Sequence, residues 1–148
     1  MNIDQIIDNA LKEDIGDGDH TSLACIPIYR RGRAKLIVKE NGVIAGIEIA
    51  KKVFQKVDKD LYFNQILKDG DTVKKGDVAF TVEGSSISIL SGERLALNFL
   101  QRMSGIATKT RKMVDSIKGL STILLDTRKT TPNFRILEKM AVEIGGGK

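Results

Sequence analysis

The sequence predicts a mixed α+β domain that is followed by the beginning of an α/β series. Three observations lead to this prediction. Residues 78–83 alternate between the two faces of a strand after glycine-containing turns, as antiparallel strands do. Between residues 87 and 118, apolar residues recur every three or four positions, which is typical of a long helix. The short apolar run TILLD, residues 122–126, is typical of a parallel strand that is buried on both faces.

The chain is expected to begin with a helix and a loop. At residues 3–13 the apolar side chains recur at helical spacing and Asn2 can cap the first turn, which predicts an amphipathic helix. The glycines and aspartates of residues 14–22 then indicate a loop. The one cysteine, Cys25, allows no internal disulfide, suits a reducing cytosol and is expected to be a small buried residue.

Strands and a second helix are predicted for the middle of the chain. Residues 33–39 alternate like a half-buried strand, and residues 40–46 form a turn with a short strand. The apolar face of residues 47–57 predicts a helix. Residues 61–83 combine turns with two-residue alternation, so we expect only strands there. The side chains expected to point inward from the first of these strands are those of Ala34, Leu36 and Val38.

The last part of the chain alternates helix, strand and helix. After the long helix, Gly119 acts as a stop signal and the strand at residues 122–126 follows. Thr131 and Pro132 then open a last helix. The inner face of this helix is expected to contain Phe134, Leu137, Ala141 and Ile144.

Two domains follow from this order of elements. Residues 1–105 mix helices with antiparallel strands, whereas residues 106–148 begin a β/α series. A barrel cannot close with one strand, and both a barrel and an open parallel sheet need several more β/α units. We therefore expect the second domain to be truncated.

Composition limits the classes of function. The chain has 148 residues, a formal charge of +5 and 5% aromatic residues. Because few aromatic rings are available to stack on bases, the basic excess favours a small phosphorylated or carboxylated substrate over nucleic acid. No apolar run is long enough to span a membrane, and the acidic N-terminus lacks the basic region of a secretory signal. We therefore expect a cytoplasmic protein that does not bind membranes.

A cluster of anion-binding residues follows the predicted strand, in the stretch LLDTRKTTPN. At the carboxyl end of a parallel strand, side chains face the ligand crevice. Arg128 offers a planar fork for a carboxylate or phosphate, and Lys129 a mobile point charge. The hydroxyls of Thr127, Thr130 and Thr131 add neutral donors. The alternative hypothesis is a surface turn with two solvated cations.

A second candidate region is SGERLALNFLQRMSGIAT, residues 91–108. In a helix, Gly92 is less favourable than alanine by about 1 kcal/mol. The need for a close approach to the backbone would explain a glycine at this position. Arg94 is expected in the first turn of the helix, where the helix dipole disfavours a cation. Asn98 and Ser104 lie near the apolar stripe, as polar groups in a packed interface do. The alternative is that Arg94 is exposed and paired with an acid.

Two further motifs carry weaker indications. The stretch EDIGDGDHTS has four acids and the only histidine, His20, but it does not fit a calcium loop or a zinc site. We therefore expect a structural loop, no metal ligands and a His20 that is not catalytic. The glycines at 145–147 indicate a close backbone approach or a helix end, and they match no phosphate-binding loop.

Together, three stretches resemble the quinolinate phosphoribosyltransferase family, also called nicotinate-nucleotide pyrophosphorylase (carboxylating). They are EDIGDGDHTS, GERLALNFLQRMSGIAT and LDTRKTTPNFRILEKMAVEIGGGK, in the order of the family and over the whole chain. The resemblance implies a pentosyltransferase of NAD biosynthesis. Such an enzyme converts quinolinate and phosphoribosyl pyrophosphate to nicotinate mononucleotide, pyrophosphate and carbon dioxide.

The resemblance also implies a fold, an assembly and site residues. The fold is an α/β sandwich followed by an incomplete TIM-like α/β barrel. The assembly is a homodimer with shared active sites, in which Arg94 reaches into the partner's site to hold quinolinate. Thr127, Arg128 and Lys129 match the strand-end trio that binds the quinolinate carboxylates, with Lys129 as the catalytic residue.

The chain departs from the family in two respects. The family's later segments are absent, and the Mg²⁺ ligands and most phosphoribosyl pyrophosphate contacts are expected there, so we expect this chain alone to be inactive. Asn133 stands where a glycine is commoner, a small change because asparagine also tolerates unusual φ angles.

Two alternatives to this enzyme stay open. LKDGDTVKKGDVAFTVEG is similar to biotinyl and lipoyl carrier domains, although Lys74 and Lys75 lack the usual context of a modified lysine. The molybdenum-transport-associated protein of the same superfamily shares the architecture.

Overall fold

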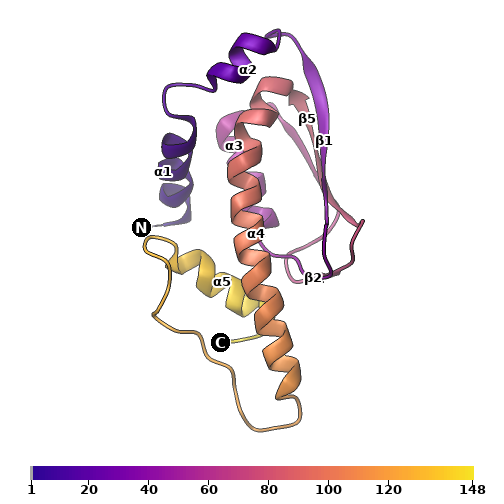
Figure 1. Ribbon diagram of the computed structural model, residues 1–148, viewed down its shortest axis with the longest axis vertical. Helices are drawn as coiled ribbons and strands as arrows, with labels where there is room; N and C mark the ends of the chain where they lie inside the picture. Colours follow the sequence, from indigo (N-terminus) through magenta and orange to yellow (C-terminus); the bar gives the residue numbers. More distant parts are fainter. Residues whose placement is uncertain (1) are drawn as a thin grey trace.

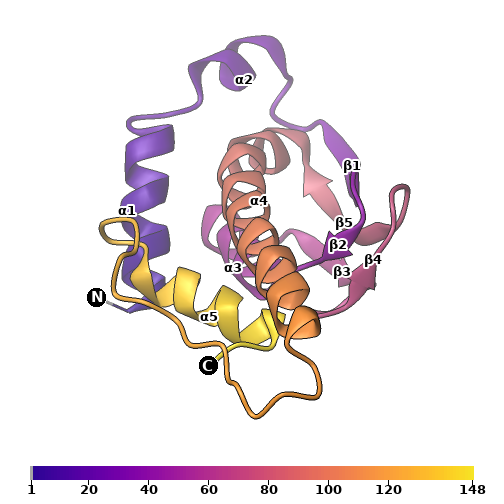
Figure 2. The same ribbon diagram turned by 60° about the horizontal axis from the view of Figure 1, so that its bottom comes forward.

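The structure is a computed structural model that describes residues 2–148. The long helix α4 (Ser86–Ser116) is its axis. A β-sheet lies along one side of α4, and the helices α1 and α5 lie on the other side (Figures 1 and 2). Helix α4 therefore connects the sheet region to the C-terminal part of the chain.

Five short strands make two antiparallel sheets. In the larger sheet, β5 (Val78–Ser85) lies between β1 (Arg31–Ile37) and β3 (Tyr62–Gln65). In the smaller sheet, β2 (Gly42–Val43) pairs with β4 (Thr72–Val73). Strands are the only regular elements between Leu61 and Glu83, which confirms the prediction for that region.

Helix positions agree closely with the predicted periodicities. Helix α1 (Ile3–Ile15) begins with a capping box, in which Asn2 and Gln5 each accept a hydrogen bond from the other's backbone amide. Helix α3 (Ile47–Val57) has the predicted bounds, and its buried face packs on α4. Helix α5 (Arg135–Gly145) begins three residues after Pro132, so Thr131 and Pro132 form a preceding turn and not the first helical turn.

One continuous apolar core joins the sheet, α3, α4 and α5. Leu137 and Ala141 of the last predicted helix are fully buried, while Phe134 and Ile144 pack at its margin. The largest fully buried side chains of this core are Ile7, Ile47, Ile49, Val53, Val82, Met103 and Leu137.

Two glycines allow helices to approach α4 closely. A Cβ atom on Gly92 would lie 3.0 Å from a ring carbon of Phe54, so the glycine admits α3 against α4, as the sequence analysis proposed. A Cβ atom on Gly145 would lie 2.6 Å from the Ala107 carbonyl oxygen, so α5 also crosses α4 at close range. Gly146, with a φ of 98°, then ends α5.

Three predictions for the first half of the chain were wrong in detail. The first strand begins at Arg31 and not at residue 33, and Ala34 is exposed while Leu36 and Val38 pack against the core. Part of the predicted loop forms the short helix α2 (His20–Cys25), which Asp19 caps. Cys25 is exposed and not buried, because α2 packs on the rest of the protein through one short face only.

The predicted parallel strand at residues 122–126 was also wrong. This segment is extended but is not part of a sheet, and the side chains of Ile123 and Leu125 are 58% and 70% exposed. Its backbone pairs only with Lys148, whose amide donates to Leu124 and whose carbonyl accepts from Asp126. These two bonds have the pattern of a parallel pair, but one pair of residues leaves both faces of the segment uncovered.

The fold is therefore mixed α/β, and residues 2–148 contain no closed barrel. Among the described helices, none combines the length and the apolar character that a membrane span requires.

Candidate functional site

The loop between the extended segment and α5 carries the predicted cations. The Lys129 amide donates to Thr127 Oγ1 at 3.2 Å, and the Thr130 amide donates to the Arg128 carbonyl at 3.0 Å, so the backbone turns tightly. The side chains of Arg128 and Lys129 are exposed, and among the described residues neither forms an ion pair or a side-chain hydrogen bond. Both cations are thus available to an anion.

Two cationic side chains of α5 hold this loop. Arg135 donates from Nε to Thr130 Oγ1 at 3.0 Å and from Nη2 to the Arg128 carbonyl at 3.3 Å. Lys139 Nζ lies 2.8 Å and 2.6 Å from the two carboxylate oxygens of Asp126. The residue before the loop and the loop itself are therefore tied to the same helix.

Glu138 is the most buried charged side chain near the loop, with 7% of its surface exposed. Its carboxylate accepts from Arg102 Nε and Nη2 at 3.0 and 2.6 Å, and from the Thr131 amide and Oγ1 at 3.1 and 2.8 Å. Burial alone would raise the pKa of Glu138, but the hydrogen bonds from Arg102 and Thr131 lower it below its ordinary value. Glu138 is therefore ionised at neutral pH.

Arg94 lies apart from this loop within one chain. Its guanidinium donates to Asp14 Oδ1 at 3.0 Å, and its side chain is 73% exposed. Because α4 begins at Ser86, Arg94 lies beyond the first turn, and the dipole argument of the sequence analysis was wrong. Within this chain, Arg94 therefore pairs with Asp14 and not with Thr127, Arg128 or Lys129.

The acidic stretch near the N-terminus has structural roles. Asp19 accepts from the amide and hydroxyl of Ser22, and these hydrogen bonds lower the pKa of Asp19. His20 is exposed, and its Nε2 lies 3.1 Å from Asp17 Oδ1. Within residues 2–148 there is no group of three or more histidine, cysteine or acidic side chains that could hold a metal ion.

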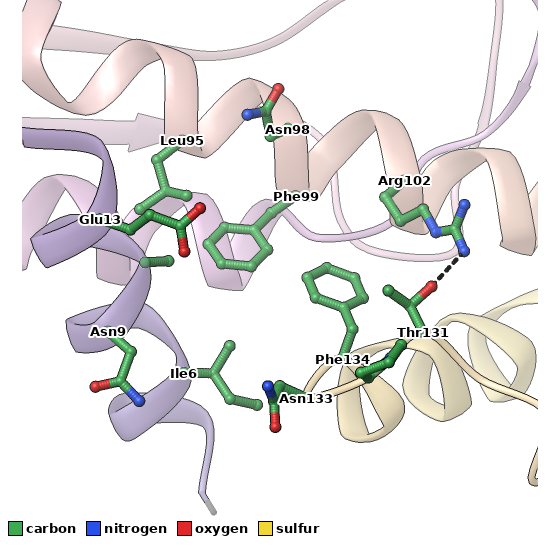
Figure 3. A pocket seen from close by; sticks show the side chains of 12 residues that line it. Ile6, Asn9, Glu13, Leu95, Asn98, Phe99, Arg102, Thr131, Asn133 and Phe134 are labelled. Carbon is green, nitrogen blue, oxygen red and sulfur yellow. Dashed lines mark hydrogen bonds between the residues drawn. The ribbon is translucent and has the colours of Figure 1, made fainter.

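A groove of about 550 Å³ lies between α1, α4 and the turn before α5, and it leads to the loop (Figure 3). The rings of Phe99 and Phe134 stack across it with centroids 5.6 Å apart. Arg102 stands at one end, where its guanidinium donates to Thr131 Oγ1 at 2.9 Å (Figure 3). Asn133 lines the groove with a φ of 62°, the one positive φ outside glycine in residues 2–148, as its place in the motif predicted.

The polar residues near the apolar stripe of α4 differ in environment. Ser104 Oγ accepts from the Ala45 amide and donates to the Ala45 carbonyl, as expected for an interface. Asn98 is exposed and lines the groove.

The sequence analysis missed four residues that support the loop: Arg102, Arg135, Glu138 and Lys139. Two features indicate Arg102 and Glu138 in retrospect. Arg102 follows Arg94 by eight residues, and so lies near the same face of a helix. Glu138 comes directly after the inner-face residue Leu137, where a charged group requires a partner.

Two family models match the chain. The model described as the quinolinate phosphoribosyl transferase N-terminal domain matches residues 19–104. The model of the C-terminal domain of the same family matches residues 106–148.

Similar proteins carry the same family name. Quinolinate phosphoribosyltransferase (decarboxylating) 1 of Nicotiana glauca is 46% identical over 144 residues, which are 97% of this chain and 41% of the relative. The probable nicotinate-nucleotide pyrophosphorylase (carboxylating) of Synechocystis sp. is 43% identical over 144 residues, 97% of this chain and 48% of the relative. The crystal structure of NadC from Streptococcus pyogenes superposes with a TM-score of 0.94 at 40% identity, covering 98% of this chain and 52% of that one.

The chain thus spans about two fifths to one half of the relatives that it matches. The family models and the relatives confirm the resemblance derived from the three sequence stretches. The chain belongs to the quinolinate phosphoribosyl transferase family.

Proposed function

We propose that the whole protein containing this chain transfers the phosphoribosyl group of phosphoribosyl pyrophosphate to quinolinate. The products are nicotinate mononucleotide, pyrophosphate and carbon dioxide, in the biosynthesis of NAD. The family membership of residues 19–104 and 106–148 supports this reaction. The observation that carries the proposal is the loop at the end of the extended segment, where Arg128 and Lys129 form no ion pair with any residue in 2–148.

The charge of quinolinate fits this loop. Quinolinate has two carboxylates, so a binding site needs at least two cations held in fixed positions. Arg128 supplies a fork that can bind one carboxylate through two parallel hydrogen bonds. Thr127 adds a hydroxyl donor, and Lys129 adds a positive charge near the reacting ring, which makes it the catalytic residue of this proposal.

Arg94 is proposed to act in a second subunit of a homodimer. It is exposed and is held in its own chain by one ion pair with Asp14. An exposed ion pair of this kind is typically worth only about 0.2–1 kcal/mol, so the guanidinium can exchange Asp14 for a substrate carboxylate at little cost. The side-chain contact of Arg94 in its own chain is with Asp14 of α1 and not with the loop, which supports an arginine that completes the partner's site.

Mg²⁺ is part of the proposal, but the described residues do not fit a site for it. Mg²⁺ binds to proteins through one or two carboxylates together with substrate phosphates. The two carboxylates beside the loop are already paired, Asp126 with Lys139 and Glu138 with Arg102, and residues 2–148 contain no group of three potential ligands. We therefore assign the Mg²⁺ ligands to the part of the family beyond residue 148 and derive no step through the ion.

The finer fold prediction also belongs to this proposal. We interpret residues 1–105 as the sandwich domain and residues 106–148 as the start of the barrel. The parallel pattern of hydrogen bonds between Lys148 and residues 124–126 supports this interpretation, because Lys148 then begins the neighbouring strand after α5. Cytoplasmic location stays a prediction of the sequence.

The alternative functions have less support. In a carrier domain, the modified lysine stands at a hairpin tip. The Lys75 amide donates to Asn41 Oδ1 and the Lys74 amide to Asp77 Oδ2, so both lysines lie in a turn that the rest of the fold holds. Mass spectrometry that finds biotin or lipoate on Lys74 or Lys75 would establish the carrier function. A molybdenum-transport-associated protein would share the architecture but would not consume quinolinate.

The test is an assay of the whole protein with quinolinate and phosphoribosyl pyrophosphate, following nicotinate mononucleotide and carbon dioxide together. We expect both products in equal amounts. Arg128→Ala is expected to lower kcat/KM for quinolinate. The loss should correspond to about 2–5 kcal/mol of transition-state stabilisation, the usual cost of removing one partner of a charge contact that bound substrate buries. Absence of both products from the wild-type protein with both substrates and Mg²⁺ would contradict the proposal.

A further inference from the structure

One face of α5 is built to hold the cation-bearing loop. Arg135, Glu138 and Lys139 stand at positions i, i+3 and i+4, which share one side of a helix. Each contacts a different part of the loop or its entrance. Lys139 binds Asp126, Arg135 binds Thr130 and the Arg128 carbonyl, and Glu138 binds Thr131.

Glu138 makes the most constrained of these contacts. Its buried carboxylate accepts four hydrogen bonds, two from Arg102 and two from Thr131. Arg102 also donates to Thr131 Oγ1, so Thr131 is held by its amide and by both functions of its hydroxyl. Thr131 is only two residues after Lys129, and a shift of this residue would therefore move the cations.

This network is separate from the packing that joins the two helices. Helices α4 and α5 are already joined by the close approach of Gly145 to Ala107 and by the buried Leu137 and Ala141. A buried carboxylate adds a desolvation cost to such an interface, and its hydrogen bonds offset that cost. What Glu138 and Arg102 add beyond packing is a fixed position for Thr131.

We propose that Glu138 and Arg102 are positioning residues, which hold Thr131 so that Arg128 and Lys129 meet the two substrate carboxylates in one geometry. This inference rests on the proposed function. Neither positioning residue needs to touch the substrate. In the alternative that Arg102 binds the substrate directly, its effect would not depend on the hydroxyl of residue 131.

The test compares matched variants of the whole enzyme. Thr131→Val keeps the shape of the side chain and removes the hydroxyl, Thr131→Ser restores the hydroxyl, and Glu138→Gln removes the charge. For Thr131→Val and Glu138→Gln we expect the KM for quinolinate to rise about 10-fold or more, which is the usual effect of one hydrogen bond to a charged group. The KM for phosphoribosyl pyrophosphate should stay within about twofold, and Thr131→Ser should recover most of the loss.

Lys56→Ala serves as the control, because it removes an ion pair with Asp8 between α3 and α1, and neither of these residues lines the groove. It should leave both KM values unchanged. Equal increases in both KM values, a fall in kcat alone, or no recovery in Thr131→Ser would overturn the positioning role. An inactive wild-type enzyme would instead contradict the proposed function itself.

Hydrogen exchange on the whole protein gives a second readout that does not need activity. In Glu138→Gln, amides of residues 127–131 should exchange faster than in the wild type, while the amides of α5 keep their protection. Faster exchange throughout α5 would mean that Glu138 stabilises the helix and not the loop, which would also overturn the proposal.

Discussion

Residues 2–116 and the segment 117–133 use their apolar side chains in opposite ways. In the first region, most of the large apolar residues of α3, α4 and the sheet are buried in one core. In the second, Ile123 and Leu125 are mainly exposed, and the segment is attached through Asp126, Thr130 and Thr131. The first region is thus stabilised by packing, and the second is held in place by polar contacts.

This difference shows what each kind of element requires. An amphipathic helix or a hairpin finds its partners within a few tens of residues, so residues 2–116 contain almost everything that their core needs. A strand of a parallel sheet is covered on both sides by strands and on both faces by helices, which come from distant parts of a chain. Among residues 2–148, only Lys148 forms backbone hydrogen bonds with the segment 122–126.

The largest expected effect is the contrast between two identical substitutions. Leu100→Ala removes a buried side chain from α4, and we expect the free energy of unfolding to fall by about 2–5 kcal/mol. Leu125→Ala removes an exposed side chain and should change it by no more than about 0.5 kcal/mol. Urea denaturation of both variants of this chain measures the contrast, and similar losses would remove the distinction between the two regions.

A second pair of variants tests packing within α4. Gly92→Ala places a methyl group 3.0 Å from the Phe54 ring, so we expect a loss of about 1–3 kcal/mol in the free energy of unfolding. Gly105→Ala in the same helix meets no atom within 4 Å and should stabilise the protein by up to about 1 kcal/mol. Thermal denaturation distinguishes these outcomes, and a stabilising Gly92→Ala would disprove the close approach of α3.

The polar attachment of the segment should depend on pH. Because the pKa of Glu138 is lowered in the folded protein, its contribution to stability is complete above the ordinary carboxylate value of 4.5 and is lost as the pH falls through the folded value. The wild type should exceed Glu138→Gln by about 1 kcal/mol at pH 7. Denaturation at several pH values should find this difference closing below pH 4.5, and a difference independent of pH would argue against an ionised Glu138.

The smallest effect is expected at Arg94. Asp14→Asn removes the one ion pair that holds Arg94 in its own chain, and the exposure of the arginine limits the loss of stability to about 0.5 kcal/mol. Chemical denaturation measures this value. A loss above about 2 kcal/mol would mean that the structural role of Arg94 outweighs any role in a partner's site.

Local patterns were sufficient for most of the first region. The periodicity of residues 47–57 predicted the bounds of α3, and the close approach at Gly92 was inferred from its cost in a helix. The same reasoning missed α2, because the glycines and aspartates before it indicate a loop although Asp19 is a good cap. It also placed Cys25 in the core, since residue type says little about how a short helix packs.

The candidate site was predictable only in its chemistry. The stretch DTRKTT predicted an anion-binding loop, but the supporting Glu138 and Lys139 come from the next helix and Arg102 from the preceding one. Their contacts depend on how α4 crosses α5, which no spacing in the sequence specifies.

Mixed dimers of the whole enzyme test the central claim most directly, namely that Arg94 and the loop of Arg128 and Lys129 come from different subunits to bind one substrate. Arg94→Ala and Lys129→Ala proteins should each be nearly inactive alone. Co-expressed with different tags and purified as heterodimers, they should regain one working site per dimer, because one site then receives an intact Arg94 and an intact loop. Heterodimers as inactive as the two parents would contradict a site shared between subunits.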